Sequence, residues 1–341
     1  MSNSETRRLR GALIGCGFFG QIQAEGWSRT PGATIVAACD PDVERARSVS
    51  PNAFTDLDQM LAATELDFVD IATRPDSHLE LVRWAVEHRL PTICQKPLAN
   101  SVEDARAILR LCEQSEARVM VHENWRWQPW FREAHRLIAA GSIGEPLCYQ
   151  FRMRQRDGYG SNAYPNQPYF RSMPRLLIHE TLVHAVDTSR FFFGDVVSVF
   201  ARARRVNPLI AGEDRALLTL VHSGTVDGVI DGHRFGNPDP SGPAMGDTVI
   251  EGESAVLRIS AAGQINLNGS EVYAPPPNLP GYKGDSVRAV QMHFLECLRN
   301  GEPMESSVKA YWNTFATVEA AYASVLSGCS AAVVPFHADS N

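Results

Sequence analysis

Two groups of polar residues in this chain have the types and the spacing that proton transfer at a hydroxyl group needs. Lys96 follows a predicted strand, where a lysine can hydrogen-bond a substrate hydroxyl and stabilise a developing alkoxide. Glu180, His184 and Asp187 are spaced i, i+4 and i+7, which places them on one helix face. An imidazole beside a carboxylate can act as a general base, because the acid fixes its tautomer and raises its basicity. The structural alternatives are a surface lysine and a polar helix face satisfied by neighbouring backbone.

A glycine-rich segment, Gly15-Cys16-Gly17-Phe18-Phe19-Gly20, indicates a dinucleotide site. It lies between an apolar run and a helix-compatible stretch, and Asp40 ends the next apolar run. In this pattern the first glycine permits a tight turn, the second lets the backbone approach a pyrophosphate, and the third lets the helix pack on the strand. The helix N-terminus offers free N–H groups to the phosphates. Asp40 can accept hydrogen bonds from a ribose and would repel a 2′-phosphate, which favours NAD over NADP.

The ends of two further predicted strands complete the expected cofactor site. Gln95-Lys96-Pro97 and Thr73–His78 each follow an apolar strand pattern, and ligands of doubly wound sheets bind outside the carboxyl ends of the strands. The nicotinamide half should pass Thr73 and the backbone after it; a packing or capping role is the alternative for His78. The expected cofactor contacts are Gly15, Gly17, Phe18, Phe19, Gly20, Asp40, Thr73, Pro75, His78, Gln95 and Lys96.

Aromatic and basic residues indicate where a substrate would bind. The segment Asn124–Trp130 combines aromatic faces, which suit sugar rings, with a guanidinium, which suits a carboxylate or phosphate. Hinge packing is the alternative. Further arginines downstream favour an anionic substrate such as a sugar acid, unless the strand arginines face solvent; they are Arg152, Arg154, Arg156, Arg171 and Arg175. We expect the substrate to contact Asn124, Arg126, Arg171 and His179.

A metal site is not expected. His179 and His184 are five residues apart and point about 140° apart on an ideal helix, which does not suit a shared zinc ion. The seven cysteines form no CxxC pair and most lie in apolar runs, which is typical of reduced thiols in a cytoplasmic protein.

The bulk composition excludes several other classes of function. The chain has 341 residues, is 44% apolar and carries a formal net charge of −7, which argues against nucleic-acid or membrane-surface partners held by general attraction. It has no run of about eighteen apolar residues, so no transmembrane helix is expected. Residues 1–10 are polar and do not resemble a signal peptide.

The order of apolar patterns predicts the elements that must position these residues. Strands and helices alternate up to about residue 123, which predicts a parallel sheet covered on both faces. A helix at 131–140 is followed by strand patterns at 147–156, 196–204, 216–222, 225–233, 248–250, 255–259 and 264–267, with helices at 286–299 and 307–327. We therefore predict a doubly wound Rossmann domain at 1–123 and an α+β domain at 124–341 with a large, mainly antiparallel open sheet. Long loops at 157–174 and 234–246 are expected to carry binding groups.

Taken together, the glycine loop, Thr73–His78, Lys96-Pro97 and the helix of Glu180, His184 and Asp187 resemble the Gfo/Idh/MocA family of NAD(P)-dependent sugar and polyol oxidoreductases. The resemblance covers nearly the whole chain. It implies hydride transfer at a sugar or polyol carbon, with Lys96 holding the hydroxyl, His184 taking its proton and the open sheet used for dimer or tetramer assembly. Two departures from the family pattern stand out: Gln95 replaces a glutamate, and Glu180 and Leu182 replace an aspartate and a nearby glycine.

The leading hypothesis is an NAD-dependent dehydrogenase acting on a CH–OH group of a sugar, polyol or sugar acid, with Lys96, His184 and Glu180 as the catalytic residues. A redox-neutral enzyme with tightly held NAD, such as an isomerase, epimerase or glycoside-cleaving enzyme, is one alternative. A non-catalytic NAD-sensing protein is another. The expected partners are a small carbohydrate and further copies of the chain as a homodimer or homotetramer, with no nucleic acid and no membrane.

Overall fold

The computed structural model describes residues 7–236 and 242–336, and within them the chain forms two compact units. Unit 1 contains the chain through Asn124 together with Asp285–Tyr311, and unit 2 contains Trp125–Gly284 and the chain from Trp312 onward. The sequence-based prediction divides the chain at residues 123 and 124 and assigns all of 124–341 to the second domain, whereas the compact units are discontinuous in sequence. The segment Asp285–Tyr311 joins unit 1 because its amphipathic helix packs there, with the Gln291 amide donating to the backbone oxygen of Gln23 (2.9 Å).

Unit 1 is built on a six-stranded, wholly parallel sheet in the order β3-β2-β1-β4-β5-β6, which confirms the predicted doubly wound fold. The strands are β1 (Leu9–Ile14), β2 (Ala33–Cys39), β3 (Ala53–Phe54), β4 (Phe68–Ile71), β5 (Thr92–Gln95) and β6 (Val119–His122). The strand order reverses between β1 and β4, so their carboxyl ends form the crevice where ligands of such folds bind.

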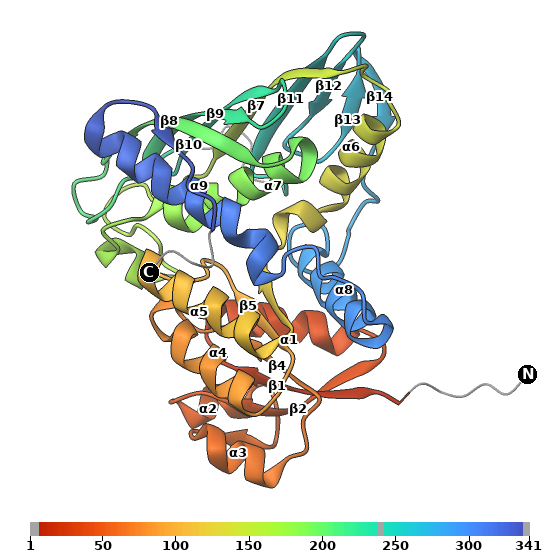
Figure 1. Cartoon of the computed structure of the whole chain (residues 1–341), viewed down its shortest axis with the longest axis vertical. Helices are drawn as coiled ribbons and strands as arrows, with labels where there is room; N and C mark the ends of the chain where they lie inside the picture. The colour runs from red at the N-terminus through yellow and green to blue at the C-terminus, as the bar shows by residue number, and fades with distance from the viewer. Residues whose placement is uncertain (1–6, 237–241, 337–341) are drawn as a thin grey trace, which may run out of the picture. The chain divides into compact units, whose positions relative to one another are not determined.

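Several helices of unit 1 begin after a polar side chain that caps them. The helices of this unit are α1 (Phe18–Arg29), α2 (Val43–Arg47), α3 (Leu57–Ala63), α4 (His78–Glu87), α5 (Val102–Ser115) and α8 (Ser286–Asn300), and α4 and α5 lie side by side in Figure 1. Ser101 caps α5, since its Oγ accepts the N–H of Asp104 (3.0 Å). The edge of the sheet is covered beyond β6, where Val121 donates to the backbone oxygen of Ser306 (2.8 Å).

Unit 2 is built on a nine-stranded sheet that is antiparallel except for the parallel pair β7 and β10, as the sequence predicted in its main features. In spatial order the strands are β14 (Ser270–Tyr273), β13 (Ile265–Leu267), β12 (Val256–Ile259), β11 (Gly246–Gly252), β7 (Pro146–Arg154), β10 (Asp227–His233), β9 (Arg215–His222), β8 (Val196–Arg204) and β15 (Ala331–Ala332). The sequence missed β14 and β15, because β14 is largely exposed and without an apolar alternation and β15 has only two residues.

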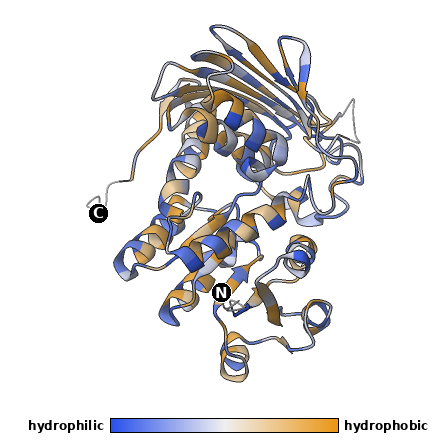
Figure 2. Cartoon of the chain, turned by 90° about the vertical axis from the view of Figure 1, so that its right-hand side faces the viewer, coloured by the Kyte–Doolittle hydropathy of each residue, from blue (hydrophilic) through white to orange (hydrophobic). Residues whose placement is uncertain are grey.

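One face of this sheet is covered by helices, as Figure 1 shows for α6 (Pro129–Ala139) and α7 (Val183–Phe193). Along β7 buried Tyr149, Phe151 and Met153 alternate with exposed residues, and the Phe151 ring meets Phe131 of α6 at 6.0 Å between centroids. The uncovered face carries polar and apolar residues, and Figure 2 shows both colours along these strands. This alternation is what an antiparallel sheet with one solvated face requires.

The remaining elements of unit 2 are short, apart from a long last helix. They are the 3₁₀ turns η2 (Trp125–Trp127) and η3 (Pro168–Ser172), a π-helical turn at Leu177–Leu182, and α9 (Val308–Ser327), which belongs to unit 2 from Trp312 onward. In the predicted loop 157–174, Ala163, Tyr164 and Phe170 form a small core together with Leu176 and Ile210 from outside the loop. In the predicted loop 234–246, residues 237–241 lie outside the described residues, as do residues 1–6 of the polar start. No helix in the described part of the chain has the length and apolar character needed to cross a bilayer.

Candidate functional site

Each glycine of the loop has the backbone geometry or the surrounding space that its expected role needs. Gly15 adopts a positive φ of 89°, and a Cβ there would lie 2.7 Å from the side chain of Thr73. A Cβ on Gly20 would lie 2.2 Å from the Gly15 oxygen, so the helix approaches the loop too closely for any side chain. A Cβ on Gly17 would meet no described atom within 4 Å, which leaves open space where a phosphate would pass. These positions therefore fit a bound dinucleotide.

Asp40 lies at the end of β2 and hydrogen-bonds the glycine loop. Its Oδ2 accepts the N–H of Cys16 (2.8 Å) and its Oδ1 accepts the N–H of Asp42 (2.9 Å). The side chain of Cys16 is buried, and burial raises its pKa to about 12, so this cysteine packs in the loop as an inert thiol. At the start of α1 Gly17 supplies no side-chain cap, so the first N–H groups of the helix are available to phosphates.

His78 joins the loops that follow β4 and β5. Its Nδ1 lies 3.1 Å from the backbone oxygen of Leu98 and its Nε2 lies 3.2 Å from that of Thr73. The ring is fully buried, and this burial lowers its pKa, so the imidazole is neutral and donates to only one of the two carbonyls. These contacts connect the loop after β4 to the loop after β5. They also hold Thr73 in place, whose Oγ1 accepts a bond from Ser77 (2.8 Å).

Lys96 lies directly after β5 and is buried, with 8% of its surface exposed. Its backbone N–H donates to the side-chain Oε1 of Gln95 (2.8 Å), and the bond to Pro97 is cis. The amide of Gln95 therefore orients the backbone at the lysine, a role that a glutamate at this position would share. Burial of a lysine at the ligand-binding end of the sheet is unusual for a surface residue and fits a group that meets a ligand.

In unit 2 the helix that carries the predicted catalytic residues is not a regular α-helix. It begins with the π-helical turn Leu177–Leu182 and continues as α7, so the i, i+4, i+7 face predicted for Glu180, His184 and Asp187 is interrupted. The wider turn changes the direction in which these side chains leave the helix, and such turns occur frequently at functional sites. The sequence carries no local signal that separates a π turn from an α turn here.

The two carboxylates of this helix bind arginines. Asp187 is fully buried and binds Arg126, with Nε to Oδ2 and Nη2 to Oδ1 both at 2.7 Å, and it accepts a further bond from Thr314 (2.9 Å). Glu180 accepts bonds on Oε2 from Thr181 (2.8 Å) and Arg234 (3.4 Å). Two nitrogens of Arg126, which the sequence predicted as a substrate group, are therefore engaged by Asp187.

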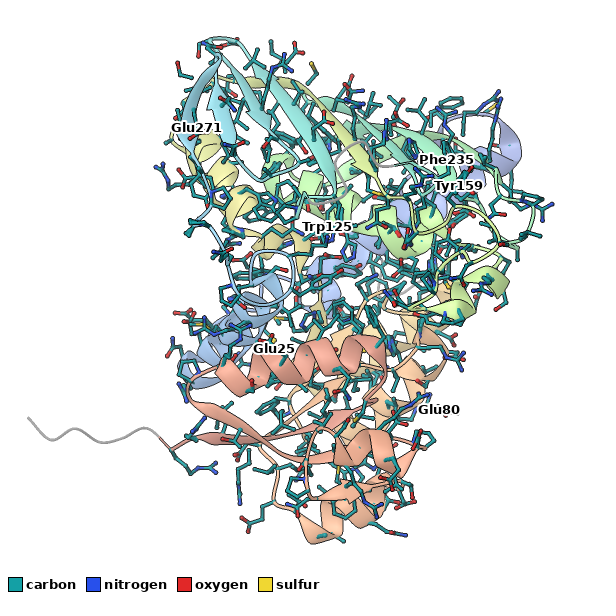
Figure 3. The ribbon with its side chains drawn as sticks, turned by 180° about the vertical axis from the view of Figure 1, so that it is seen from behind. Glu25, Glu80, Trp125, Tyr159, Phe235 and Glu271 are labelled. Carbon is teal, nitrogen blue, oxygen red and sulfur yellow. The ribbon has the colours of Figure 1, made fainter. Side chains whose placement is uncertain are left out.

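His184 is buried and lies flat against Trp125. The two rings are parallel, with their centroids 4.9 Å apart, and Trp125 is labelled in Figure 3. This stacking limits rotation of the imidazole and holds its edge in one direction. The sequence marked the segment of Trp125 for its aromatic faces but contained no sign that one of them would cover the histidine. His179, from the preceding π turn, is also buried.

The other residues predicted to bind substrate lie in different settings. Asn124 belongs to unit 1, where its amide donates to Ser286 (3.0 Å). Arg171 donates from Nε to the backbone oxygen of Ala163 (2.7 Å), within the loop 157–174. The other arginines that suggested an anionic substrate are also engaged: Arg152 binds Asp247, Arg154 binds Asp231, Arg175 binds Glu319, and Arg156 covers the ring of Tyr159. The arginine cluster that the sequence indicated is thus dispersed among internal pairs.

No group of three or more histidine, cysteine or acidic side chains that could hold a metal ion occurs within residues 7–236 and 242–336.

The structure also adds residues that the sequence reasoning missed. Arg234, Tyr282 and Lys283 lie within electrostatic reach of Asp157, and the first two also of Glu180. They come from segments with no motif, so only the folded chain brings them to this helix.

Comparison with known proteins agrees with this geometry. Residues 9–123 match the profile described as "Oxidoreductase family, NAD-binding Rossmann fold", and residues 131–254 match the GFO/IDH/MocA C-terminal domain. The chain belongs to the Gfo/Idh/MocA family. With matches to both domain models and an intact dinucleotide loop, it is an NAD-dependent oxidoreductase.

Three relatives of this family member match over nearly their whole length. A D-apiose dehydrogenase from Rhizobium rhizogenes is 36% identical over 94% of this chain and 96% of its own. A D-apiose dehydrogenase from Paraburkholderia graminis is 35% identical over 96% of this chain and 90% of its own. The solved structure of an oxidoreductase from Agrobacterium radiobacter, in complex with NAD+, L-tartaric acid and magnesium, is 34% identical with a TM-score of 0.87, covering 96% of this chain and 98% of that one.

Proposed function

We propose that this Gfo/Idh/MocA protein is a dehydrogenase that oxidises a CH–OH group of a neutral sugar or polyol, with NAD preferred over NADP. The observation that carries this proposal is that Lys96 is buried at the carboxyl end of β5, in a chain whose two units both match the family. The full-length likeness to two proteins named D-apiose dehydrogenase supports a sugar as the substrate. The bound NAD would supply the hydride acceptor.

The residues of the chain would then handle the hydroxyl proton. Lys96 would donate a hydrogen bond to the substrate oxygen and stabilise the negative charge that develops on it. His184 would accept the proton as general base, with its ring held by the parallel face of Trp125. Glu180 would lie beside this path as the third catalytic group, with its carboxylate held by Thr181. Gln95 and His78 would position the two strand ends that face the cofactor.

A neutral substrate is favoured because the arginines that suggested an anion are engaged. Arg126 binds Asp187, and Arg171 binds a carbonyl of its own loop. A guanidinium that already binds a carboxylate through two nitrogens gains little from a second anion. A sugar acid remains the second candidate, supported by the relative whose solved structure contains L-tartaric acid.

Formation of NADH, followed by its absorbance, tests this function with a panel of neutral sugars that includes D-apiose, polyols and sugar acids. Lys96→Ala should lower kcat by about 10²- to 10⁴-fold on the preferred class, and Lys309→Ala, which changes an exposed lysine, should not. Product formed without net NADH would instead identify a redox-neutral enzyme. NAD binding with no product from any compound would point to a sensing protein.

Two further features support an assembly and a compartment. The uncovered face of the large sheet exposes Leu217 and Val221 of β9, which suits burial against a second copy in a homodimer or homotetramer. All seven cysteines lie in the described part of the chain as free thiols, which suits the cytoplasm. Light scattering of the purified protein tests the assembly, and a monomer at micromolar concentration would contradict it.

A further inference from the structure

Arg234 is a buried arginine that no motif marks and that the proposed reaction does not use. It is the first residue after β10, and its backbone N–H donates to the backbone oxygen of Asp214 (3.0 Å). Its guanidinium is 5% exposed and contacts two separate parts of unit 2. Nε donates to Asp157 Oδ1 (3.0 Å) and Nη2 to Asp157 Oδ2, while Nη1 donates to Thr181 Oγ1 (2.9 Å) and Glu180 Oε2 (3.4 Å).

The planar guanidinium suits this position better than any other cation. Its two-nitrogen edge binds Asp157, which opens the loop 157–174, and its remaining nitrogen reaches the helix of Glu180. An ammonium is a single point charge and cannot bind both partners with this geometry. The buried charge is tolerated because two carboxylates face it.

The same guanidinium also organises the interior of the loop. It lies over the rings of Tyr164 and Phe170, at 4.8 and 5.1 Å from their centroids, and both rings belong to the core of the loop. The backbone oxygen of Arg234 accepts the N–H of Gly158 (2.9 Å). Figure 3 labels Tyr159, which follows Gly158 in the chain, and Phe235, which follows Arg234. The loop is therefore fastened to Arg234 by charge, by ring contact and by backbone.

Tyr282 and Lys283 add donors to the same cluster. Burial raises the pKa of Tyr282 to about 12, with the charge of Glu180 acting in the same direction, so its phenol keeps its proton. Lys283 is half-buried, and this partial burial lowers its pKa although the charge of Asp157 acts against the shift. Carboxylates that accept and hydroxyl or ammonium groups that donate, held at fixed positions, are what recognition of a polyhydroxylated neutral ligand requires.

We propose that Arg234 is a positioning residue that fixes the loop 157–174 and the Glu180 carboxylate in one arrangement, and so determines which sugar hydroxyls the enzyme accepts. This inference rests on the proposed function. In the proposed reaction Arg234 touches neither the reacting atoms nor the cofactor, and it acts through Asp157 and Glu180. Its loss should therefore affect sugar binding and the choice between epimeric sugars more than the rate of a correctly bound complex.

The test compares Arg234→Lys, Arg234→Met and Asp157→Asn with the wild type on the preferred sugar and on an epimer of it. Arg234→Lys should raise KM for the preferred sugar about 10- to 100-fold and change the ratio of kcat/KM for the two sugars, while KM for NAD changes by less than about 2-fold. Asp157→Asn should shift KM and the ratio in the same direction, and Arg234→Met combined with Asp157→Asn should be no worse than Arg234→Met alone. The matched control is Arg136→Lys, which alters an exposed arginine paired with Glu133 in unit 2.

A lower kcat with an unchanged sugar KM and an unchanged epimer ratio in both Arg234→Lys and Asp157→Asn would overturn the proposal, because it would show that the cluster affects the folded fraction or the catalytic Glu180 and not the recognition of the sugar. NADH binding, followed by its fluorescence, measures that folded fraction, so Arg234→Lys and Asp157→Asn decide the question if Arg234→Met does not fold. If the wild type forms no NADH from any sugar, the proposed function has failed. The positioning role is then measured from the melting shift that the same sugars produce with NADH present, and equal shifts in wild type and Arg234→Lys would overturn it.

Discussion

Arg126 and Asp187 form a two-point ion pair, with Nε 2.7 Å from Oδ2 and Nη2 2.7 Å from Oδ1. Both side chains are almost entirely removed from water, at 9% and 0% exposed. Each therefore neutralises a charge that the interior would otherwise penalise strongly. The pair joins η2, which carries Trp125, to α7, which carries His184, and so supports the stacking of those two rings.

Removing one member of this pair should destabilise the protein. We expect Asp187→Asn to lower the free energy of unfolding by about 3–5 kcal/mol, because a buried guanidinium is left without its counter-charge. Replacing both partners by apolar residues, Arg126→Met with Asp187→Leu, should recover most of that loss. Denaturant unfolding followed by circular dichroism measures the change, and Arg136→Met at an exposed pair should alter it by less than about 1 kcal/mol. A single Asp187→Asn effect as small as that of Arg136→Met would contradict the expectation.

The glycine loop allows folding and cofactor binding to be separated. Gly17→Ala should fold with an unchanged melting temperature, because its Cβ meets no described atom within 4 Å and its φ of −71° suits alanine. It should nevertheless weaken NAD binding by about 10-fold or more, since the methyl group would lie where a phosphate passes. Gly20→Ala should instead lower the melting temperature, because its Cβ would lie 2.2 Å from a backbone oxygen. Calorimetric NAD titration and thermal unfolding of both variants decide this, and equal melting losses would show that the space at Gly17 is not open.

The Rossmann half of the protein could be predicted from the sequence because its signals are local. The glycines of the loop, the apolar strand runs and the Ser101 cap each depend on neighbours a few residues away. The order of the strands follows from the alternation of strand and helix, which permits few topologies. The large sheet was also predicted from the alternation of its strands, apart from two short edge strands without that signal.

The partners of the candidate site could not be predicted because they are distant in sequence. Arg126 and Asp187 are 61 residues apart, and Asp157 and Arg234 are 77 apart. In each case any of several arginines was a candidate partner, and the choice depends on how sheet and helix pack. The π turn changed the face of Glu180 as well, and its cause lies in tertiary packing that a helical wheel does not represent. The likeness to a family indicated which residues matter but not which groups hold them.

Asp40 is expected to set the preference for NAD. Asp40→Asn removes the charge that would repel a 2′-phosphate and keeps one of the two side-chain acceptors that bind Cys16 and Asp42, so the ratio of kcat/KM for NAD over NADP should fall by about 10-fold or more. Asp40→Ala should also loosen the glycine loop, because Cys16 and Asp42 lose their acceptors. Initial rates with each cofactor at a saturating sugar concentration measure the ratio. An unchanged ratio in Asp40→Asn would show that the carboxylate does not face the adenosine ribose.

Asp70 should make the stability of the protein depend on pH in an unusual direction. Its side chain is fully buried in β4, and this burial raises its pKa from 3.8 to about 7, although bonds from Trp27 (2.6 Å) and Gln23 (2.8 Å) act against the shift. Because the folded pKa lies above the unfolded one, the folded state binds more protons between about pH 4 and pH 7. The contribution of Asp70 to the free energy of unfolding is therefore fully present below about pH 4 and is lost as the pH rises to about 7.

Asp70→Asn removes the titrating group and should therefore flatten this part of the stability curve. In the wild type we expect the contribution of Asp70 to the free energy of unfolding to fall on the order of 3 kcal/mol between pH 4 and pH 7. Glu65→Gln is the matched control, because Glu65 is an exposed acid of the same unit. Urea unfolding across this range, taken as the difference between wild type and each variant, isolates the contribution. If the difference between wild type and Asp70→Asn does not change with pH, the carboxyl stays ionised in the core, and Gln23 and Trp27 must then stabilise its charge more strongly than burial opposes it.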